Sequence, residues 1–519
     1  MSFIYVTEGI YYALPISFGQ FPGTNTLLTY GLGTFLEAWS VIAAVWLTVA
    51  MPRTSADYVA ISRILSPPLG FLASMLLWQA VMFWVGGATS YVSTMLGDIL
   101  IGVGTATKAE ALVNLGSALV NDIVVVVACG ILIIITYFIL NLVGTKYVSL
   151  VANIMFAWIV IGSAIGIGAF AYWNFASPGF APNAWDHVWG AGAWNEVETV
   201  AKSNGWADFV TGAAGDVSNW GWPGGWTMAA SMAAMPTALE SIWGFELGTV
   251  VAGEIKEPAK SFTYGTLGSL ALCTVYHFIA IIVTTGFYGQ WISYFSYNAL
   301  NGYTDQYQVN AATSAWWSHL LAAPLYGFST PLGIFVEMIG VVCNYAYGLW
   351  AMTWSTRYLF AWSFDRFGPQ AFAKVNQRWR TPHYALLFIA IVAAIYIPAM
   401  YINPLIAVVN LGAGAFLRYF LICITTMILP FVKPQIFERG IATWTIKGMP
   451  VATIIASIGA PFTAFVYISF VARLAGDYLS MAYQAFWLGF PMIIFMAYWA
   501  HNKSKGIDVM ALYREIPPA

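Results

Sequence analysis

The sequence predicts an all-α polytopic membrane protein with about twelve transmembrane helices. Its 519 residues are 60% hydrophobic and only 8% charged. An average soluble domain is about 25% charged, so most of this chain cannot face water. Several apolar runs reach about 20 residues, the length that spans a bilayer as a helix. Because lipid offers no partners to backbone polar groups, the spans must be helices or closed barrels, and the continuous apolar runs indicate helices.

The apolar runs are taken next in chain order. They predict helices near 2–18, 27–50, 69–97, 120–142, 148–174, 226–252, 264–288, 330–361, 383–401, 404–430, 451–473 and 480–500. The whole chain, 1–519, is expected to form one transmembrane domain with a cytoplasmic tail at 501–519.

Two long segments, 175–225 and 289–329, are predicted to be outer loops. The first is rich in tryptophan, and we interpret it as a partly ordered loop with its rings at the lipid headgroups. An outer lid is the alternative. The tryptophans concerned are Trp185, Trp189, Trp194, Trp206, Trp220 and Trp222.

Basic residues orient the chain. With both termini cytoplasmic, every Lys and Arg lies in an inner segment except Lys108, Lys202 and Arg473 in outer segments and Arg418 within a span. This bias predicts a multi-pass protein of the cytoplasmic membrane with an even number of crossings. The four cysteines all fall in apolar runs, so we expect small core residues rather than disulfides.

The stretch "AAMPTALESIWGFELGTVVAGEIKEPAK" at 233–260 interrupts an apolar run with Pro236, Glu240, Gly244 and Glu246. Proline removes a helix donor and glycine loosens the backbone, so unwinding is expected near 238–246. Ionisable residues at membrane depth face a cavity or a partner as a rule. This segment is therefore a candidate functional site.

Four stretches carry a family resemblance. They are "VTEGIYYALP" at 6–15, "AMPRTSADYVAISRILSPPLGF" at 50–71, "GFELGTVVAGEIKEP" at 244–258 and "STRYLFAWSFDRFGPQAFAKVNQRWRTPHYAL" at 355–386. In order and spacing they are similar to the first helix, an inner loop, the sixth helix and a second inner loop of amino acid permeases of the amino acid–polyamine–organocation (APC) superfamily. The chain therefore resembles that superfamily over nearly its whole length.

The resemblance implies a LeuT-type fold, in which two inverted five-helix repeats (2–174 and 226–430) precede two extra helices (451–500). The first and sixth helices would be broken, and their exposed half-helix ends would bind a small polar solute. The substrate-binding residues implied are Thr7, Glu8, Gly9, Glu240, Ser241, Ile242, Trp243 and Gly244. Only six residues precede Thr7, so the first helix looks truncated, and Thr7 and Glu8 stand where small residues are expected.

The coupling ion is expected to be a proton, with Glu240, Glu246 and Glu337 as candidate carriers, because burial raises a carboxyl pKa towards neutrality. A lysine that some relatives place on the fifth helix is missing from "NIMFAWIVIGSAIG" at 153–166. Sodium stays open, since carbonyl and hydroxyl oxygens can form its site. Asn344 and Tyr345 are possible polar contacts.

Two further intramembrane charges are interpreted as structural. Glu37 on the second helix and Arg418 on the tenth are expected to act as polar contacts between helices, and an ion pair between them is possible.

These observations predict a secondary active transporter that moves an amino acid by alternating access. A cationic amino acid or polyamine transporter or exchanger is the alternative, because Glu8, Glu240 and Glu246 could pair with ammonium groups. A membrane sensor without transport is a remote alternative. The chain has no clustered histidines, Asp-rich motif or phosphate-binding glycine loop, so we expect no enzyme activity, metal, cofactor or nucleic-acid partner. The predicted partners are an amino acid or amine and the lipid bilayer.

Overall fold

A computed structural model describes residues 14–21, 23–206, 228–240, 244–308, 316–398 and 404–514. The described helices of the first half are α2 (Thr26–Ala50), α3 (Ala56–Ile64), α4 (Pro67–Thr107), α5 (Glu110–Asn121), α6 (Ile123–Val143), α7 (Thr145–Ala176), α8 (Ala181–Trp189) and α9 (Ala193–Ser203). Within the described residues, the prediction of an all-helical polytopic protein is confirmed.

The second half begins with α11 (Met228–Glu240), the 3₁₀ helix η2 (Phe245–Glu254), α12 (Pro258–Tyr288), α13 (Trp291–Leu300), η3 (Tyr303–Gln306), α14 (Trp317–Ala322), η4 (Ala323–Leu325) and η5 (Gly327–Ser329). It continues with α15 (Pro331–Phe364), η6 (Gln370–Ala373), α16 (His383–Tyr396), α18 (Pro404–Val432), α19 (Pro434–Phe437), α20 (Val451–Arg473), α21 (Tyr478–Ser504) and α22 (Val509–Arg514). Two short strands, β1 (Thr445–Ile446) and β2 (Met449–Pro450), pair antiparallel.

Nine helices in the described part of the chain are long and apolar enough to cross a membrane: α2, α4, α6, α7, α12, α15, α18, α20 and α21. Helix α16 is apolar but shorter. Some of the long spans begin at side-chain caps: Asn25 accepts from the Leu28 N–H at the start of α2, and Thr330 accepts from the Gly333 N–H at the start of α15. Such caps satisfy N–H groups that the helix itself leaves without partners.

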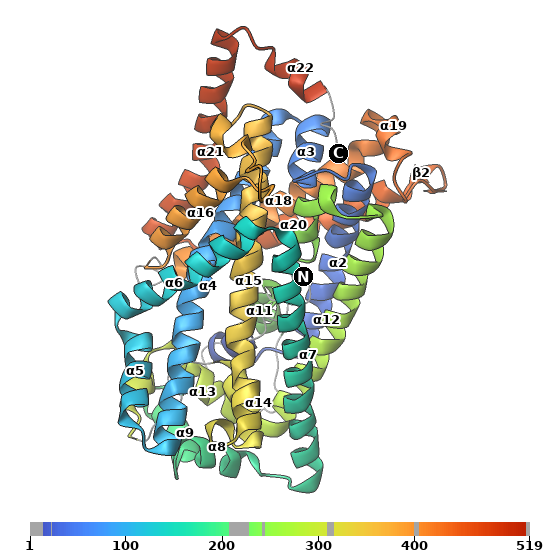
Figure 1. Ribbon diagram of the computed structural model, residues 1–519. Helices are drawn as coiled ribbons and strands as arrows, with labels where there is room; N and C mark the ends of the chain where they lie inside the picture. Colours follow the sequence, from blue (N-terminus) through green and yellow to red (C-terminus); the bar gives the residue numbers. More distant parts are fainter. Residues whose placement is uncertain are drawn as a thin grey trace.

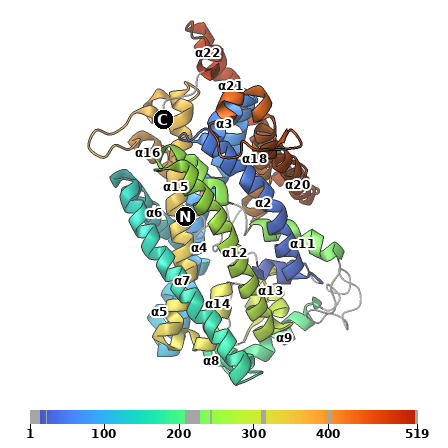
Figure 2. The same cartoon turned by 90° about the vertical axis from the view of Figure 1, so that its right-hand side faces the viewer.

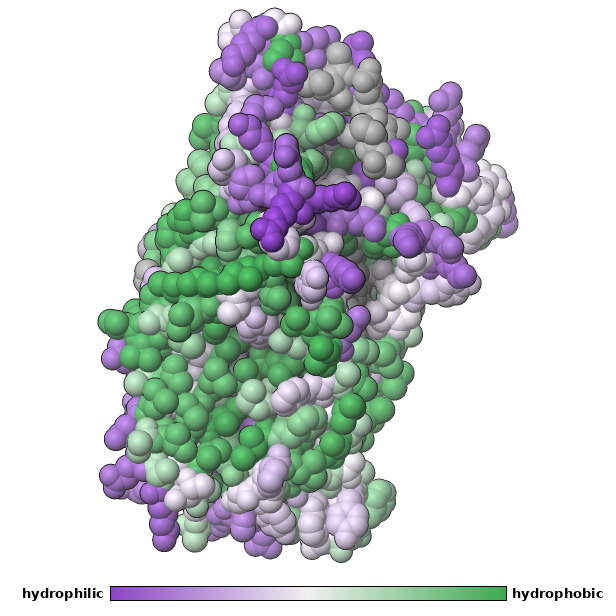
Figure 3. Space-filling model, viewed as in Figure 1, coloured by the Kyte–Doolittle hydropathy of each residue, from purple (hydrophilic) through white to green (hydrophobic). Residues whose placement is uncertain are grey.

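The helices differ in how deeply they are buried. Helices α4 and α15 run side by side through the centre of the molecule (Figures 1 and 2) and are mostly buried. In helices α6, α7 and α21, by contrast, only about a quarter of the residues are buried. On the face drawn in Figure 3, hydrophobic residues form a broad band between hydrophilic residues at the two ends. This band has the distribution expected of a surface in contact with lipid.

The two ends of the helix bundle are distinct. We call the end with α3, α19 and α22 the α3 end, and the opposite end with α8, α9 and α13 the α8 end (Figures 1 and 2). The segments 175–225 and 289–329, predicted to be outer loops, contain the short helices α8, α9, α13 and α14 where they are described.

Three of the tryptophans in the first of these segments are enclosed by protein instead of facing outwards. Trp185, Trp189 and Trp206 are buried in the protein, and Trp194 stacks on Trp291 with ring centroids 4.1 Å apart. These short helices fold back onto the spans because burying large aromatic rings stabilises the packing. Trp220 and Trp222 lie outside the described residues.

Candidate functional site

The sixth predicted span is interrupted in the structure. Helix α11 ends at Glu240, and the chain is described again from Gly244, which has a left-handed φ of 107° and begins η2. Pro236 lies inside α11, where it removes one backbone donor. The left-handed Gly244 and the 3₁₀ helix that follows it agree with the unwinding predicted near 238–246 inside the span 226–252.

Tyr419 on α18 contacts the interruption directly. The Gly244 backbone N–H donates a hydrogen bond to the Tyr419 hydroxyl at 3.2 Å, and the tyrosine is fully buried. A helix that stops inside a protein leaves N–H and C=O groups that need partners. Tyr419 supplies one of them, and sequence reasoning missed it because a tyrosine in an apolar run carries no sign of its partner.

Replacing Tyr419 by phenylalanine is expected to lower stability by about 1–3 kcal/mol, because the buried Gly244 N–H loses its acceptor. Thermal unfolding in mild detergent measures the change. Tyr478→Phe on α21 is the matched control, since that ring is 87% exposed. Equal melting temperatures for the two variants would show that the bond to Gly244 does not contribute.

Most of the residues expected to hold substrate cannot be placed. Thr7, Glu8, Gly9, Ser241, Ile242 and Trp243 lie outside the described residues. Glu240 is the last residue of α11, and Glu246 lies in the first turn of η2. The structure thus brings Glu240, Gly244 and Glu246 to the two borders of the interruption, and their contact with substrate stays a prediction.

Glu337 lies in the second turn of α15, near the α8 end, and forms a buried cluster with two residues that the sequence reasoning missed. Its Oε2 is 2.9 Å from Nδ1 of His319 on α14, and Nε2 of the same ring is 3.4 Å from Oδ2 of Asp98 on α4. Burial alone would lower the pKa of His319, but the Glu337 charge and hydrogen bonds to both carboxylates raise it from 6.5 to about 10. His319 was missed because it lies in a segment expected to be a loop.

Asn344 and Tyr345 lie further along α15 and face different helices. Asn344 donates to the Gly340 carbonyl at 3.0 Å and lies 3.6 Å from the Met95 sulfur on α4. The Tyr345 hydroxyl is 2.6 Å from Thr136 on α6. The structure therefore does not bring these two side chains to one surface.

Arg418 forms its ion pair with a residue that sequence reasoning had not considered. Its Nε donates to Asp57 on α3 at 2.6 Å, and Tyr358 on α15 donates to the same carboxylate oxygen at 2.6 Å. Arg418 and Asp57 side chains are 0% and 2% exposed. Glu37, the partner considered from sequence, is fully buried in α2.

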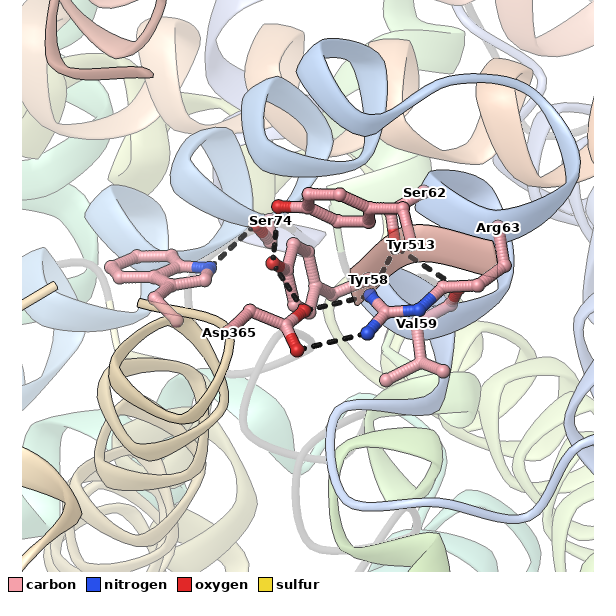
Figure 4. A network of polar contacts seen from close by, with 8 residues as sticks. Tyr58, Val59, Ser62, Arg63, Ser74, Asp365 and Tyr513 are labelled. Atoms are coloured by element: carbon pink, nitrogen blue, oxygen red, sulfur yellow. Dashed lines mark hydrogen bonds and ion pairs between the residues drawn. The ribbon is translucent and has the colours of Figure 1, made fainter. Parts of the chain in front are cut away.

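A second buried network fixes the other end of α3 (Figure 4). Arg63 donates two hydrogen bonds, at 2.7 and 2.9 Å, to the two oxygens of Asp365, which caps α15. Tyr58 also donates to Asp365 at 2.8 Å, so its oxygen is free to accept from the Tyr513 hydroxyl at 3.1 Å. The Arg63 guanidinium lies 4.8 Å from the centre of the Tyr513 ring. Helix α22 is thereby bound to α3 and to the end of α15.

Electrostatics keep this network in one protonation state. Burial, followed by the charges of Tyr513 and Asp365, raises the pKa of Tyr58 well above its ordinary value of 10. Burial likewise raises the pKa of Tyr513. Both hydroxyls are therefore neutral donors at physiological pH, and Arg63 and Asp365 are the charged pair.

An ion pair also connects η2 to α15 at the α3 end. Arg357 donates from Nε and Nη2 to the two oxygens of Glu254, at 2.7 and 3.1 Å. The pair borders a cavity of about 280 Å³. The other lining residues are Thr54, Gly144, Thr145, Phe360, Val375, Trp379, Arg380, Thr381 and Pro382.

These features define the class of the protein. It is a polytopic α-helical membrane protein with an interrupted helix against its core, an arrangement that secondary transporters use to bind solutes. The amino acid permease family matches residues 2–498, so the chain belongs to that family, within the APC superfamily. The resemblance found in the sequence is confirmed.

One curated relative extends this assignment. The chain is similar to the branched-chain amino acid permease BcaP of Bacillus subtilis (strain 168), with 24% identity over 193 residues. The matched segment spans 37% of this chain and 37% of the relative.

Proposed function

We propose that this protein is a secondary active transporter that moves an amino acid across the cytoplasmic membrane by alternating access. The observation that carries the proposal is the change of backbone conformation at Gly244, which has a left-handed φ and precedes a 3₁₀ helix, in a chain of the amino acid permease family. Tyr419 already accepts from the Gly244 N–H, but further backbone groups at such a break are not used within a helix and would be available to a polar solute.

The substrate site would lie at this break. The N-terminus of a helical segment attracts a carboxylate, and the C-terminus attracts an ammonium group. An amino acid carries both charges, so the start of η2 and the end of α11 would suit its two ends. Glu240 and Glu246 border the break and would add negative charge, which favours the ammonium group.

The α3 end would be the cytoplasmic gate, with both termini on that side, as the bias of basic residues predicts. The ion pairs Asp57–Arg418, Arg63–Asp365 and Glu254–Arg357 join α3 or η2 to α15 and α18. Opening the path would have to separate some of these contacts. Because two of the pairs are buried, we expect Glu254–Arg357, which is partly exposed, to separate first.

Uptake into proteoliposomes tests the function. Labelled neutral, acidic and basic amino acids and a polyamine are supplied in turn, first with an inward proton gradient and then with sodium. Saturable uptake of neutral amino acids that a protonophore abolishes supports a proton-coupled permease. Uptake of basic amino acids or a polyamine alone supports the cationic alternative. Uptake that requires a sodium gradient identifies sodium, in place of the proton, as the coupling ion. Uptake of none of them contradicts the proposed function.

Glu240→Gln is expected to reduce kcat/KM for uptake more than Glu37→Gln does. A hydrogen bond to a charged group contributes about 1.5–3 kcal/mol, so losing one at the substrate corresponds to a decrease of about 10- to 100-fold. Glu37 is the control because it is a buried carboxylate on a different span, α2. Near-normal uptake by both variants would contradict the role of Glu240.

A further inference from the structure

Helix α14 is a six-residue helix whose residues are all buried at the α8 end. Two of its contacts are with α12. The Trp317 Nε1–H donates to the Thr284 hydroxyl at 2.9 Å, and Tyr288 donates to the Leu320 carbonyl at 2.7 Å. In addition, the His319 side chain of α14 contacts Asp98 on α4 and Glu337 on α15. Movement of α14 would therefore have to break the His319 contacts.

The His319 cluster is arranged to hold a proton. The side chains of His319, Glu337 and Asp98 are 1%, 1% and 3% exposed. Each ring nitrogen faces a carboxylate oxygen, and only an imidazole protonated at both nitrogens can donate to both. The remaining Glu337 oxygen, Oε1, is buried and has no hydrogen-bond partner among the described residues. The geometry therefore provides an acceptor for each of the two imidazole N–H groups, and one further buried carboxylate oxygen on Glu337.

The described contacts of the His319 ring come from several elements around it. Helix α4 contributes Asp98, α15 contributes Glu337 and α12 contributes the titratable Tyr288. Helix α8 and η5 contribute the rings of Trp189 and Phe328, with centroids 5.7 and 6.3 Å from that of His319. Aromatic rings thus shield the imidazole from water, and a carboxylate oxygen lies beside each of its two nitrogens.

The proton on His319 is tied to the packed position of α14. In this position the pKa of His319 is about 10, whereas an imidazole in water has a pKa near 6.5. The resulting stabilisation of the packed position is complete below pH 6.5 and is lost progressively as the pH rises to 10. At pH 7 to 8, exposure of His319 to water would break one N–H bond and release one proton to water.

We propose that His319, Glu337 and Asp98 form a proton-binding site that is occupied when α14 packs on α4 and α15, and that release of this proton on α14 movement couples transport to the proton gradient. The coupling rests on the proposed function. The link between proton binding and the packing of α14 is independent of the proposed function. The packing and the coupling are therefore tested separately.

Cysteine labelling tests the packing of α14 without any transport. Ser318→Cys places a thiol of nearly the same size on this buried helix, next to His319. Its maleimide labelling rate is measured from pH 6.5 to 9.5 and divided by the rate for Ser504→Cys, an exposed position of α21 that reports thiol ionisation alone. The parent protein gives the background of the native cysteines, of which Cys129 is partly buried and the other three are buried.

The corrected rate is expected to rise by up to about 100-fold between pH 7 and 9, because each pH unit in this range weakens the packing tenfold. His319→Gln is expected to abolish the pH dependence. His187→Gln, an exposed histidine at the same end, is the matched control and should keep it. Glu337→Gln removes one carboxylate, so it should move the pH dependence to lower pH. This second variant keeps the test valid if His319→Gln does not fold.

The outcomes separate the two parts of the proposal. A corrected rate that does not change with pH overturns the proton-binding site. A pH-dependent rate, together with uptake that requires a proton gradient in the parent and no longer does in His319→Gln, supports both parts. If the labelling rate depends on pH but uptake does not depend on the proton gradient, the coupling is overturned and the proton-binding site is supported. A pH-dependent rate with no uptake of any substrate overturns the proposed function while the proton-binding site stands.

Discussion

Arg418→Met is expected to lower the free energy of unfolding by about 3–5 kcal/mol, because it leaves the Asp57 carboxylate buried without its cation. The two side chains are almost completely buried, and the remaining partner of Asp57 in the described structure is the hydroxyl of Tyr358. Methionine fills a similar length with an apolar side chain, so a loss of this size would come from the charge rather than from a cavity. The change is measured as thermal unfolding in mild detergent.

Two controls test this explanation. Adding Asp57→Asn to Arg418→Met removes the unpaired charge and is expected to recover most of the lost stability, since buried ion pairs are often replaceable by neutral groups. Lys202→Met breaks the exposed pair with Glu198 and should cost no more than about 1 kcal/mol. If Arg418→Met were no more destabilised than Lys202→Met, the buried pair would not stabilise the fold.

Gly86→Ala is expected to destabilise the protein strongly although it adds only one methyl group. Gly86 lies on α4, and a Cβ atom there would be 2.3 Å from the carbonyl oxygen of Ala393 on α16. That oxygen belongs to the backbone, so the helices themselves would have to separate. Small residues allow such close helix contacts in membranes. Overpacking costs about 1–3 kcal/mol, and more where the backbone must move, so we expect a loss at or above this range.

Gly265→Ala on α12 is the matched control for this prediction. A Cβ atom at Gly265 meets nothing within 4 Å, and alanine favours the helix over glycine by about 1 kcal/mol. Its melting temperature should therefore be unchanged or raised. Monodispersity in size-exclusion chromatography and thermal unfolding compare the two variants. A melting temperature of Gly86→Ala equal to that of Gly265→Ala would contradict the close packing of α4 and α16.

The fold was predictable because its main signals are local. A run of apolar residues specifies a span by its length alone, which is why the long helices from α2 to α21 follow the predicted segments closely. The interruption at Gly244 was also predictable, because proline and glycine act on their own backbone. The short helices α8 and α14 were not, since neither contains a run long enough to span a bilayer.

The polar contacts could not be predicted from local sequence. Asp57 and Arg418 are 361 positions apart, and Arg63 and Asp365 are 302 positions apart. No periodicity connects residues at such distances, so the sequence allowed Glu37 as a partner for Arg418 just as well. His319 was overlooked for the same reason, because its charge depends on two carboxylates from other helices.

The docking of Tyr513 beneath Arg63 has a consequence for how this family can vary. The Arg63 guanidinium contacts both the Tyr513 ring and the Asp365 carboxylate, and the three side chains come from three separate segments. A change at Arg63 therefore alters what the other two positions can tolerate. Among relatives, positions 63 and 365 should therefore covary strongly, and position 513 should remain aromatic only where an arginine stands at position 63. Positions 198 and 202, whose exposed pair contributes little, should drift independently of each other.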